Sequence, residues 1–85
     1  MPTILMYSTK TCPFCIQAEH LLNRRGVQVE KILVDVDTSQ LRNMIKITNR
    51  RTVPQIFIGD YHVGGYDDLV ALDIEGKLEP LLKAD

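Results

Sequence analysis

The sequence has no long run of apolar residues and no basic leader at its N-terminus, which reads MPTILMYS. A membrane-spanning helix needs about 20 consecutive apolar residues, so we expect no contact with a membrane. An export signal would combine a basic start with an apolar stretch, so we expect the protein in the cytoplasm. Structural disulfides are rarely kept in that reducing compartment.

Neither sign of charge dominates the composition. Ten Lys and Arg stand against eleven Asp and Glu, which gives a formal net charge of -1. Nucleic-acid-binding domains usually carry a marked excess of positive charge, so we expect no nucleic-acid partner. The two NRR runs, 23–25 and 49–51, fit solvated helix ends. With 85 residues, 45% of them apolar, the chain fits one small globular domain over 1–85, expected as a monomer.

Apolar periodicity and turn residues predict the order of strands and helices. The first half is expected to form a buried strand at 3–8, a helix from Pro13 to a stop at Gly26, and a strand at 27–36. A second helix, capped by Asp37 or Thr38, should follow. After it we expect a hairpin of strands 54–58 and 61–64 around Gly59-Asp60, and a last helix opened by Asp67 or Asp68 and interrupted at Gly76. A helix between two strands forms a parallel crossover unit. We therefore predict an α/β fold of order β-α-β-α-β-β-α, with a four-stranded mixed sheet and helices on both faces.

Both cysteines of the chain lie within the stretch TCPFC at residues 11–15. Pro13 suits the first position of a helix, which makes Cys12 the N-cap residue. The unpaired amides of Phe14 and Cys15 would then point at the Cys12 sulfur, and the helix dipole adds positive potential there. Both effects favour a thiolate, and Lys10 could add to the same field. We predict that Cys12 is a nucleophile near neutral pH.

Cys15 lies one turn further along the same helix, on its apolar face. A thiol placed there is shielded from bulk water but can still attack a mixed disulfide formed on Cys12. We predict that Cys15 is the resolving thiol. A bridge between residues this close constrains the unfolded chain little, which argues against a purely stabilising disulfide.

Two alternatives to a redox pair remain at this point. A structural zinc site needs four ligands, and besides Cys12 and Cys15 the chain offers only His20 and His62. His20 is expected on another face of the helix, and His62 is expected to be exposed. The other alternative is a pair of inert buried cysteines, which Pro13 at the helix start makes unfavourable because it exposes Cys12.

Three motifs in this order, CPFC at 12–15, TVP at 52–54 and GGYDDL at 64–69, resemble the glutaredoxin family, in particular its small bacterial dithiol members. The resemblance runs over essentially the whole chain and implies a thioredoxin-like fold, in agreement with the element order above. It also implies glutathione-dependent reduction of disulfides, with Cys12 and Cys15 as the catalytic pair. Thioredoxins carry the motif WCGPC, whereas this chain has no tryptophan.

The resemblance further implies a glutathione site, in which Pro54 follows a cis peptide bond and the Val53 backbone pairs with an extended peptide. The alternative is a trans proline that starts an edge strand. Amides at the start of the last helix would suit the γ-glutamyl carboxylate, and Asp67 would meet the α-amino group or act simply as an N-cap. The implied glutathione-binding residues are Lys10, Phe14, Thr52, Val53, Pro54, Gly65, Tyr66 and Asp67.

The chain departs from the common family pattern at three of these positions. Phe14 stands where the family usually has tyrosine, and Tyr66 stands where it often has cysteine. The family lysine usually lies three residues before the first cysteine, where this chain has Thr9, so Lys10 is displaced by one position.

The implied function is that of an enzyme, a glutathione-disulfide oxidoreductase that reduces protein disulfides and glutathione mixed disulfides. Glutathione is then the reducing co-substrate, no metal is expected, and the partners are disulfide-bonded or glutathionylated proteins. Ribonucleotide reductase, or another reductase with oxidised cysteines, is a candidate recipient of electrons. The alternative is a binding module, in which two chains share an iron–sulfur cluster through Cys12 and glutathione, or a zinc carrier. Visible absorbance of freshly purified protein would distinguish a cluster-binding module from the enzyme.

Overall fold

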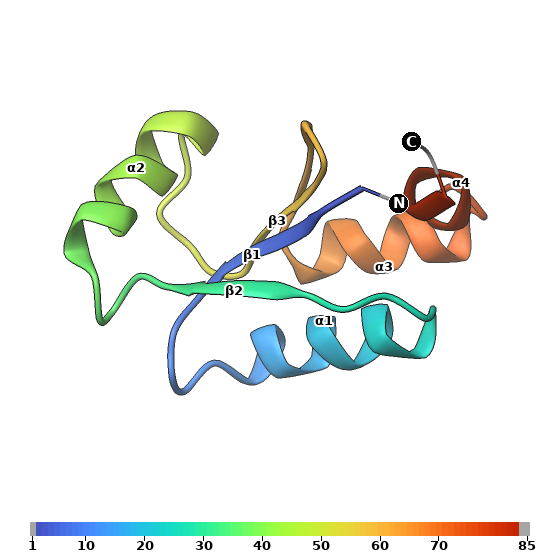
Figure 1. Ribbon diagram of the computed structural model, residues 1–85, viewed down its shortest axis with the longest axis horizontal. Coiled ribbons are helices and arrows are strands. Elements are labelled where there is room, and N and C mark those ends of the chain that lie inside the picture. Colours follow the sequence, from blue (N-terminus) through green and yellow to red (C-terminus); the bar gives the residue numbers. More distant parts are fainter. Residues whose placement is uncertain (1, 84–85) are drawn as a thin grey trace.

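The protein is described by a computed structural model that covers residues 2–83, and residues 1, 84 and 85 lie outside the described part. Figure 1 shows a central sheet with helices on both sides of it. The elements are β1 (Ile4–Ser8), α1 (Pro13–Arg24), β2 (Glu30–Leu33), α2 (Thr38–Thr48), β3 (Gln55–Ile58), β4 (Tyr61–Gly64), α3 (Tyr66–Ile74) and α4 (Leu78–Lys83).

The sheet contains four strands in the order β2-β1-β3-β4. The strands β1 and β2 are parallel, as a helical crossover through α1 requires. The other two pairs, β1 with β3 and β3 with β4, are antiparallel. The predicted hairpin turn is confirmed, with Gly59 at a φ of +57°, a backbone conformation that suits glycine. This is the predicted mixed sheet of a thioredoxin-like fold.

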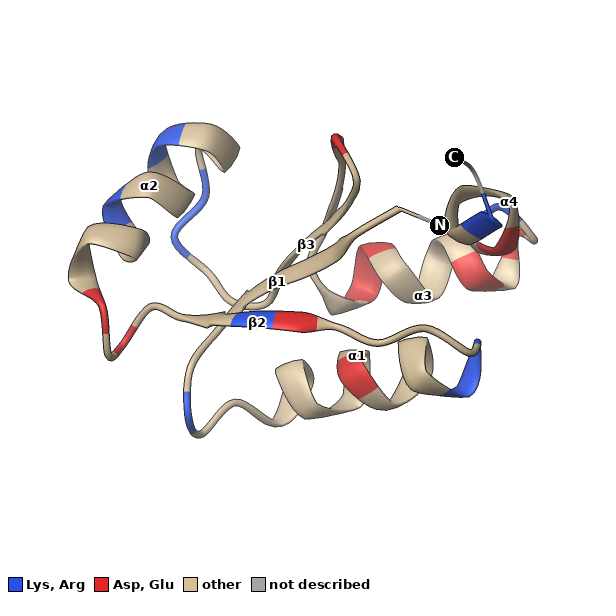
Figure 2. Ribbon diagram, viewed as in Figure 1, with Lys and Arg blue, Asp and Glu red and all other residues tan. Residues whose placement is uncertain are grey.

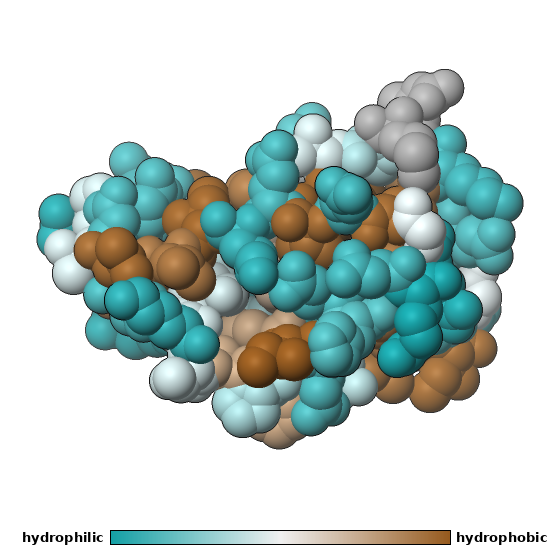
Figure 3. All heavy atoms as spheres, turned by 60° about the horizontal axis from the view of Figure 1, so that its bottom comes forward, coloured by the Kyte–Doolittle hydropathy of each residue, from teal (hydrophilic) through white to brown (hydrophobic). Residues whose placement is uncertain are grey.

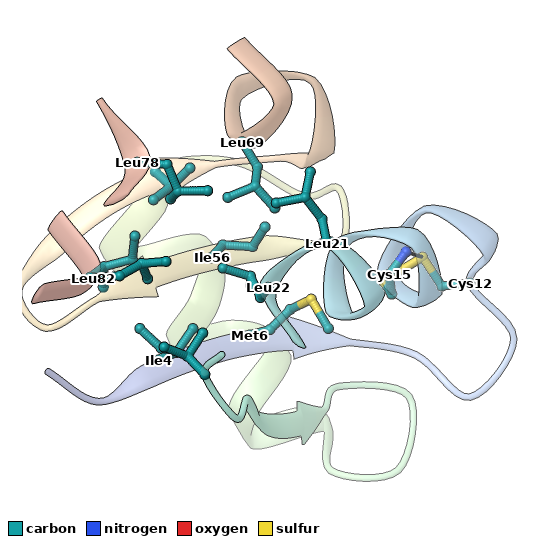
Figure 4. Close-up of a cluster of buried hydrophobic side chains, with 14 residues drawn as sticks. Ile4, Met6, Cys12, Cys15, Leu21, Leu22, Ile56, Leu69, Leu78 and Leu82 are labelled. Atoms are coloured by element: carbon teal, nitrogen blue, oxygen red, sulfur yellow. Dashed lines mark hydrogen bonds between the residues drawn. A yellow bond between two sulfur atoms is a disulfide. The ribbon is translucent and has the colours of Figure 1, made fainter. Parts of the chain in front are cut away.

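Alternation along β1 distributes its side chains between two cores. Ile4 and Met6 belong to a large cluster with residues of α1, α3 and α4. Leu5 and Tyr7 belong with Met44 of α2 to a smaller cluster on the other face of the sheet. Because successive side chains of a strand point to opposite faces, one short strand anchors helices on both sides, as predicted. Figure 4 shows the large cluster, in which Leu22 of α1 is drawn between Ile56 and Met6 of the sheet.

Several predicted boundaries are wrong. The strands β1 and β3 begin at Ile4 and Gln55, one residue later than expected. The strand expected at 27–36 is limited to Glu30–Leu33, because its only neighbour is β1 and their pairing ends at Ser8 opposite Leu33. The last predicted helix begins at Tyr66, before the expected Asp67 or Asp68, because Gly65 is its N-cap. The interruption at Gly76 is confirmed, and the residues after it form the separate helix α4.

Charged and apolar residues alternate over the surface. Figure 2 shows basic residues on α2 and on the segment that follows it, and acidic residues at the start of α3. The hydrophobic areas on the face in Figure 3 are separate patches between hydrophilic ones. The large apolar side chains that are exposed are Phe14, Ile16, Val36, Ile47, Tyr61 and Ile74.

Candidate active site

Cys12 and Cys15 are joined by a disulfide at the N-terminal end of α1 (Figure 4). Cys12 is the N-cap of the helix, with φ -129° and ψ 102°, and Pro13 follows as its first residue. The Cys15 N–H donates to the Cys12 sulfur over 3.2 Å. The predicted N-cap position is therefore confirmed, although the hydrogen bond comes from the Cys15 amide and, in the described part of the chain, none comes from the Phe14 amide.

The geometry at Cys12 favours negative charge on its sulfur once the disulfide is reduced. An N–H that donates to a thiolate stabilises it relative to the thiol, and the unpaired amides of a helix N-terminus do the same. The sulfur also lies 4.0 Å from the Val53 carbonyl oxygen, which places the residues 52–54 loop beside the cysteine pair. Cys12 is 7% exposed and Cys15 is 3% exposed, so both are buried in the disulfide form and the expectation that Pro13 exposes Cys12 is wrong.

A cleft next to the disulfide brings most of the predicted glutathione-binding residues together. Its lining residues are Phe14, Arg50, Thr52, Val53, Pro54, Gly65, Tyr66, Asp67 and Asp68. Of the glutathione-binding residues that the family resemblance implies, all except Lys10 line this cleft. The peptide bond between Val53 and Pro54 is cis, so the alternative of a trans proline is wrong.

Lys10 lies in a different pocket, which it lines together with Cys15, Ile16 and other residues. Its backbone N–H donates to the Asp35 carboxylate over 3.1 Å. The structure thus does not bring Lys10 into the cleft that the other predicted residues share. Arg50 is the one cationic residue among those that line the cleft.

The start of α3 is capped by Asp68. The Gly65 N–H donates to the Asp68 carboxylate over 2.9 Å, and Arg50 Nη1 lies 3.2 Å from the same oxygen. The Gly65 hydrogen bond, followed by Arg50, lowers the pKa of Asp68. The alternative in which Asp67 is the N-cap is therefore wrong. The exposed Asp67 carboxylate is left at the second helical position, at the edge of the cleft.

Sequence reasoning missed Arg50 and Asp68. Arg50 belongs to one of the NRR runs that we interpreted as a solvated helix end, and its partner is 18 residues away. No local sequence pattern indicates the ion pair between Arg50 and Asp68. Asp68 could have been found, because an acidic residue three positions after an N-cap is the spacing of a capping box.

Two of the departures from the family pattern meet in this cleft. The rings of Phe14 and Tyr66 stack with centroids 5.9 Å apart and planes inclined by 27°. They join the start of α1 to the start of α3 and give the cleft an aromatic wall. Tyr66, the stacking partner of Phe14, carries a hydroxyl that Phe14 lacks.

Replacing Asp68 by alanine should lower the free energy of unfolding at pH 7 by about 1 kcal/mol, the usual cost of losing a helix cap. The exposed ion pair with Arg50 adds little. Because the folded-state pKa of Asp68 is lowered, this contribution is present above its ordinary pKa of 3.8 and is lost as the pH falls through the folded value. Urea unfolding at pH 7 and at pH 2.5 measures the difference. The control is Asp67→Ala, which removes the same charge at the adjacent position. Equal losses of unfolding free energy in the two variants would refute this role for Asp68.

Two other kinds of feature are absent from residues 2–83. No group of three His, Cys, Asp or Glu side chains is placed to hold a metal ion. No helix in this part of the chain is long and apolar enough to cross a membrane.

The sequence is similar to that of known proteins over nearly its full length. Residues 4–63 match the family model described as glutaredoxin. The chain is 46% identical over 83 residues to glutaredoxin 3 of Escherichia coli (strain K12), an alignment that covers 98% of this chain and all of that protein.

Solved structures give the same result. The solution structure of glutaredoxin from Brucella melitensis superposes with a TM-score of 0.86 at 43% identity, over 98% of this chain and 90% of the other. A crystal structure of a buckwheat glutaredoxin–glutathione complex superposes with a TM-score of 0.88 at 28% identity, over 95% of this chain and 76% of the other.

Proposed function

The chain belongs to the glutaredoxin family of glutathione-linked thiol–disulfide oxidoreductases, and we propose that it reduces both glutathione mixed disulfides and protein disulfides. One observation carries the proposal. The Cys12 sulfur caps helix α1, accepts a hydrogen bond from the Cys15 amide, and lies beside the cleft formed by residues 52–54 and 65–67. A nucleophilic sulfur and a peptide-sized cleft are the two parts that this chemistry needs.

For a glutathione mixed disulfide, the Cys12 thiolate attacks the glutathione sulfur. The old S–S bond breaks, the recipient protein leaves as a thiolate that takes up a proton, and Cys12 carries glutathione. A second glutathione thiolate then attacks the bound glutathione sulfur, releasing oxidised glutathione and restoring the Cys12 thiolate. The net reaction reduces the protein sulfur to a thiol and oxidises one free glutathione, which leaves joined to the glutathione of the substrate as oxidised glutathione.

For an intramolecular protein disulfide, Cys12 first forms a mixed disulfide with one recipient sulfur. Cys15 then attacks the Cys12 sulfur, which releases the recipient as a dithiol and leaves the Cys12–Cys15 bond. The Cα atoms of the pair are 5.2 Å apart, within the range that a disulfide requires. Two glutathione molecules then reduce this bond and leave as oxidised glutathione.

The cleft offers groups for each end of glutathione. The Val53 backbone would pair with the backbone of the cysteinyl residue, and the Tyr66 and Asp67 amides at the start of α3 would hold the γ-glutamyl carboxylate. The Asp67 carboxylate would meet the α-amino group. Lys10 lies outside this cleft, so Arg50 is the cation that we assign to the remaining carboxylate.

The test is reduction of a glutathionylated peptide, coupled through glutathione reductase to NADPH oxidation, beside a parallel assay with thioredoxin reductase. We expect turnover with glutathione and glutathione reductase. Turnover that requires thioredoxin reductase and ignores glutathione would contradict the proposal. An oxidised reductase such as ribonucleotide reductase can replace the peptide to test the proposed transfer of electrons to that class of recipient.

A further inference from the structure

The amide of Gln55 connects the loop before β3 to strand β4. Gln55 follows Pro54 directly and is completely buried. Its Nε2 donates to the Thr52 carbonyl oxygen over 3.0 Å and to Thr52 Oγ1 over 3.3 Å. On its other side, Oε1 lies 2.8 Å from His62 Nε2. Both ends of one buried side chain are therefore engaged, one by the loop and one by the edge strand.

The orientation of this amide follows from the chemistry of its partners. The Thr52 carbonyl oxygen can only accept a hydrogen bond, so the group that faces it must be the Gln55 NH₂. Oε1 then faces His62 and can only accept. His62 must therefore carry a hydrogen on Nε2 and donate it to Gln55.

His62 is itself held in place. Its ring stacks on Phe57 with centroids 4.8 Å apart, and it is half-buried, so the expectation that His62 is exposed is wrong. Burial, followed by the nearby Arg50, lowers the pKa of His62, which favours the neutral ring. With one fixed donor on Nε2, His62 fixes the direction in which Gln55 points.

The consequence lies in the peptide unit between Thr52 and Val53. This peptide is trans, so its C=O and N–H point in opposite directions across one rigid plane. Gln55 holds the Thr52 carbonyl inward, and the Val53 N–H must therefore point away from Gln55. Within residues 2–83 no hydrogen bond uses this N–H, and Val53 lines the cleft next to Cys12.

We propose that Gln55, oriented by His62, is a positioning residue that presents the Val53 N–H to the backbone carbonyl of a bound glutathionyl or peptide substrate. The inference rests on the proposed function, because it assumes that the cleft beside Cys12 takes such a peptide. A preset donor binds better than one that must be oriented on binding, since the ordering cost is met during folding. Gln55 itself touches neither sulfur nor substrate.

The expected effect is on substrate affinity. One well-placed hydrogen bond to the substrate is equivalent to roughly a threefold to tenfold change in binding. The contact forms equally in the ground state and the transition state, so KM should rise while kcat stays within about twofold. The pH dependence of Cys12 reactivity should not change, because the Cys15 amide is untouched.

The experiment compares Gln55→Met, which keeps the length of the side chain but removes its hydrogen bonds, with Leu82→Ala. Leu82 lies in the core on α4 and is not among the residues that line the cleft, so it reports what loss of stability alone does. For Gln55→Met we expect a KM for glutathionylated peptide raised about fivefold to tenfold. Equal KM values in the two variants would overturn the inference.

A second readout does not depend on turnover. In wild-type protein, S-methylglutathione, which cannot react with Cys12, should shift the Val53 amide resonance in NMR spectra, and Gln55→Met should weaken both its binding and that shift. Should Gln55→Met fail to fold, His62→Phe decides. It retains a ring to stack on Phe57 but removes the donor to Gln55, and KM should rise by about twofold to threefold. An unchanged KM in His62→Phe would then refute the inference.

The proposed function and the role of Gln55 can be refuted separately. Absence of glutathione-dependent turnover in wild-type protein would refute the proposed function. Normal wild-type turnover with unaltered KM in the Gln55 and His62 variants would leave the proposed function standing and refute only the role of Gln55.

Discussion

Cys12→Ser should abolish the reduction of both glutathione mixed disulfides and protein disulfides, with kcat/KM lower by a factor on the order of 10³ or more. Both proposed pathways begin with attack by the Cys12 sulfur. A serine hydroxyl does not ionise near neutral pH, so the N–H of Cys15 and the start of α1 have no anion to stabilise. The coupled glutathione reductase assay measures the loss.

The variant is informative because serine is one of the preferred N-cap residues. Helix α1 should keep its cap, and the melting temperature of Cys12→Ser should stay close to that of reduced wild-type protein. A lost activity with an intact fold then identifies the sulfur itself as the missing part. Residual activity above a few per cent would remove Cys12 from the nucleophile role.

Cys15→Ser should separate the two reactions. Reduction of a glutathione mixed disulfide needs only Cys12 and external glutathione, so its rate should stay within a few-fold of the wild-type rate. Reduction of an intramolecular protein disulfide needs a second thiol to release the recipient, and that rate should fall by a factor on the order of 100, the advantage of an intramolecular attack. The two substrates should be assayed side by side with the same enzyme preparation.

The side chain at position 15 can be changed without touching the stabilisation of Cys12, because that contact comes from the Cys15 backbone N–H. Cys15 is also only 3% exposed, which shields it from recipients in solution. Its disulfide with Cys12 shows that it can still reach the Cys12 sulfur. If Cys15→Ser loses both activities while it remains folded, Cys15 has a role other than resolving the mixed disulfide.

Much of the fold could be predicted because its signals are local. The apolar run of β1, the Gly59 turn, and Pro13 at the start of α1 each determine a short segment by themselves. The errors occur where a distant partner decides. The strand β2 ends at Leu33, where β1 stops pairing with it, and no property of residues 34–36 indicates that end.

The site divides in the same way. Cys12 and Cys15 were predictable from one helix start, and residues 52–54 and 65–67 from their motifs. Arg50 and Gln55 were not, because their partners lie across the chain, on α3 and β4. A histidine on an edge strand gives no sign in the sequence that a buried glutamine will hold it, so His62 was expected to be exposed.

The most direct test of the account is the titration of Cys12 in reduced Cys15→Ser, where it is the only thiol. The rate of alkylation by iodoacetamide, followed by mass spectrometry as a function of pH, reports its ionisation. The capping geometry predicts a pKa clearly below the free-thiol value of about 8.5. A pKa at or above about 8.5 would contradict the claim that the start of α1 holds this sulfur as a thiolate.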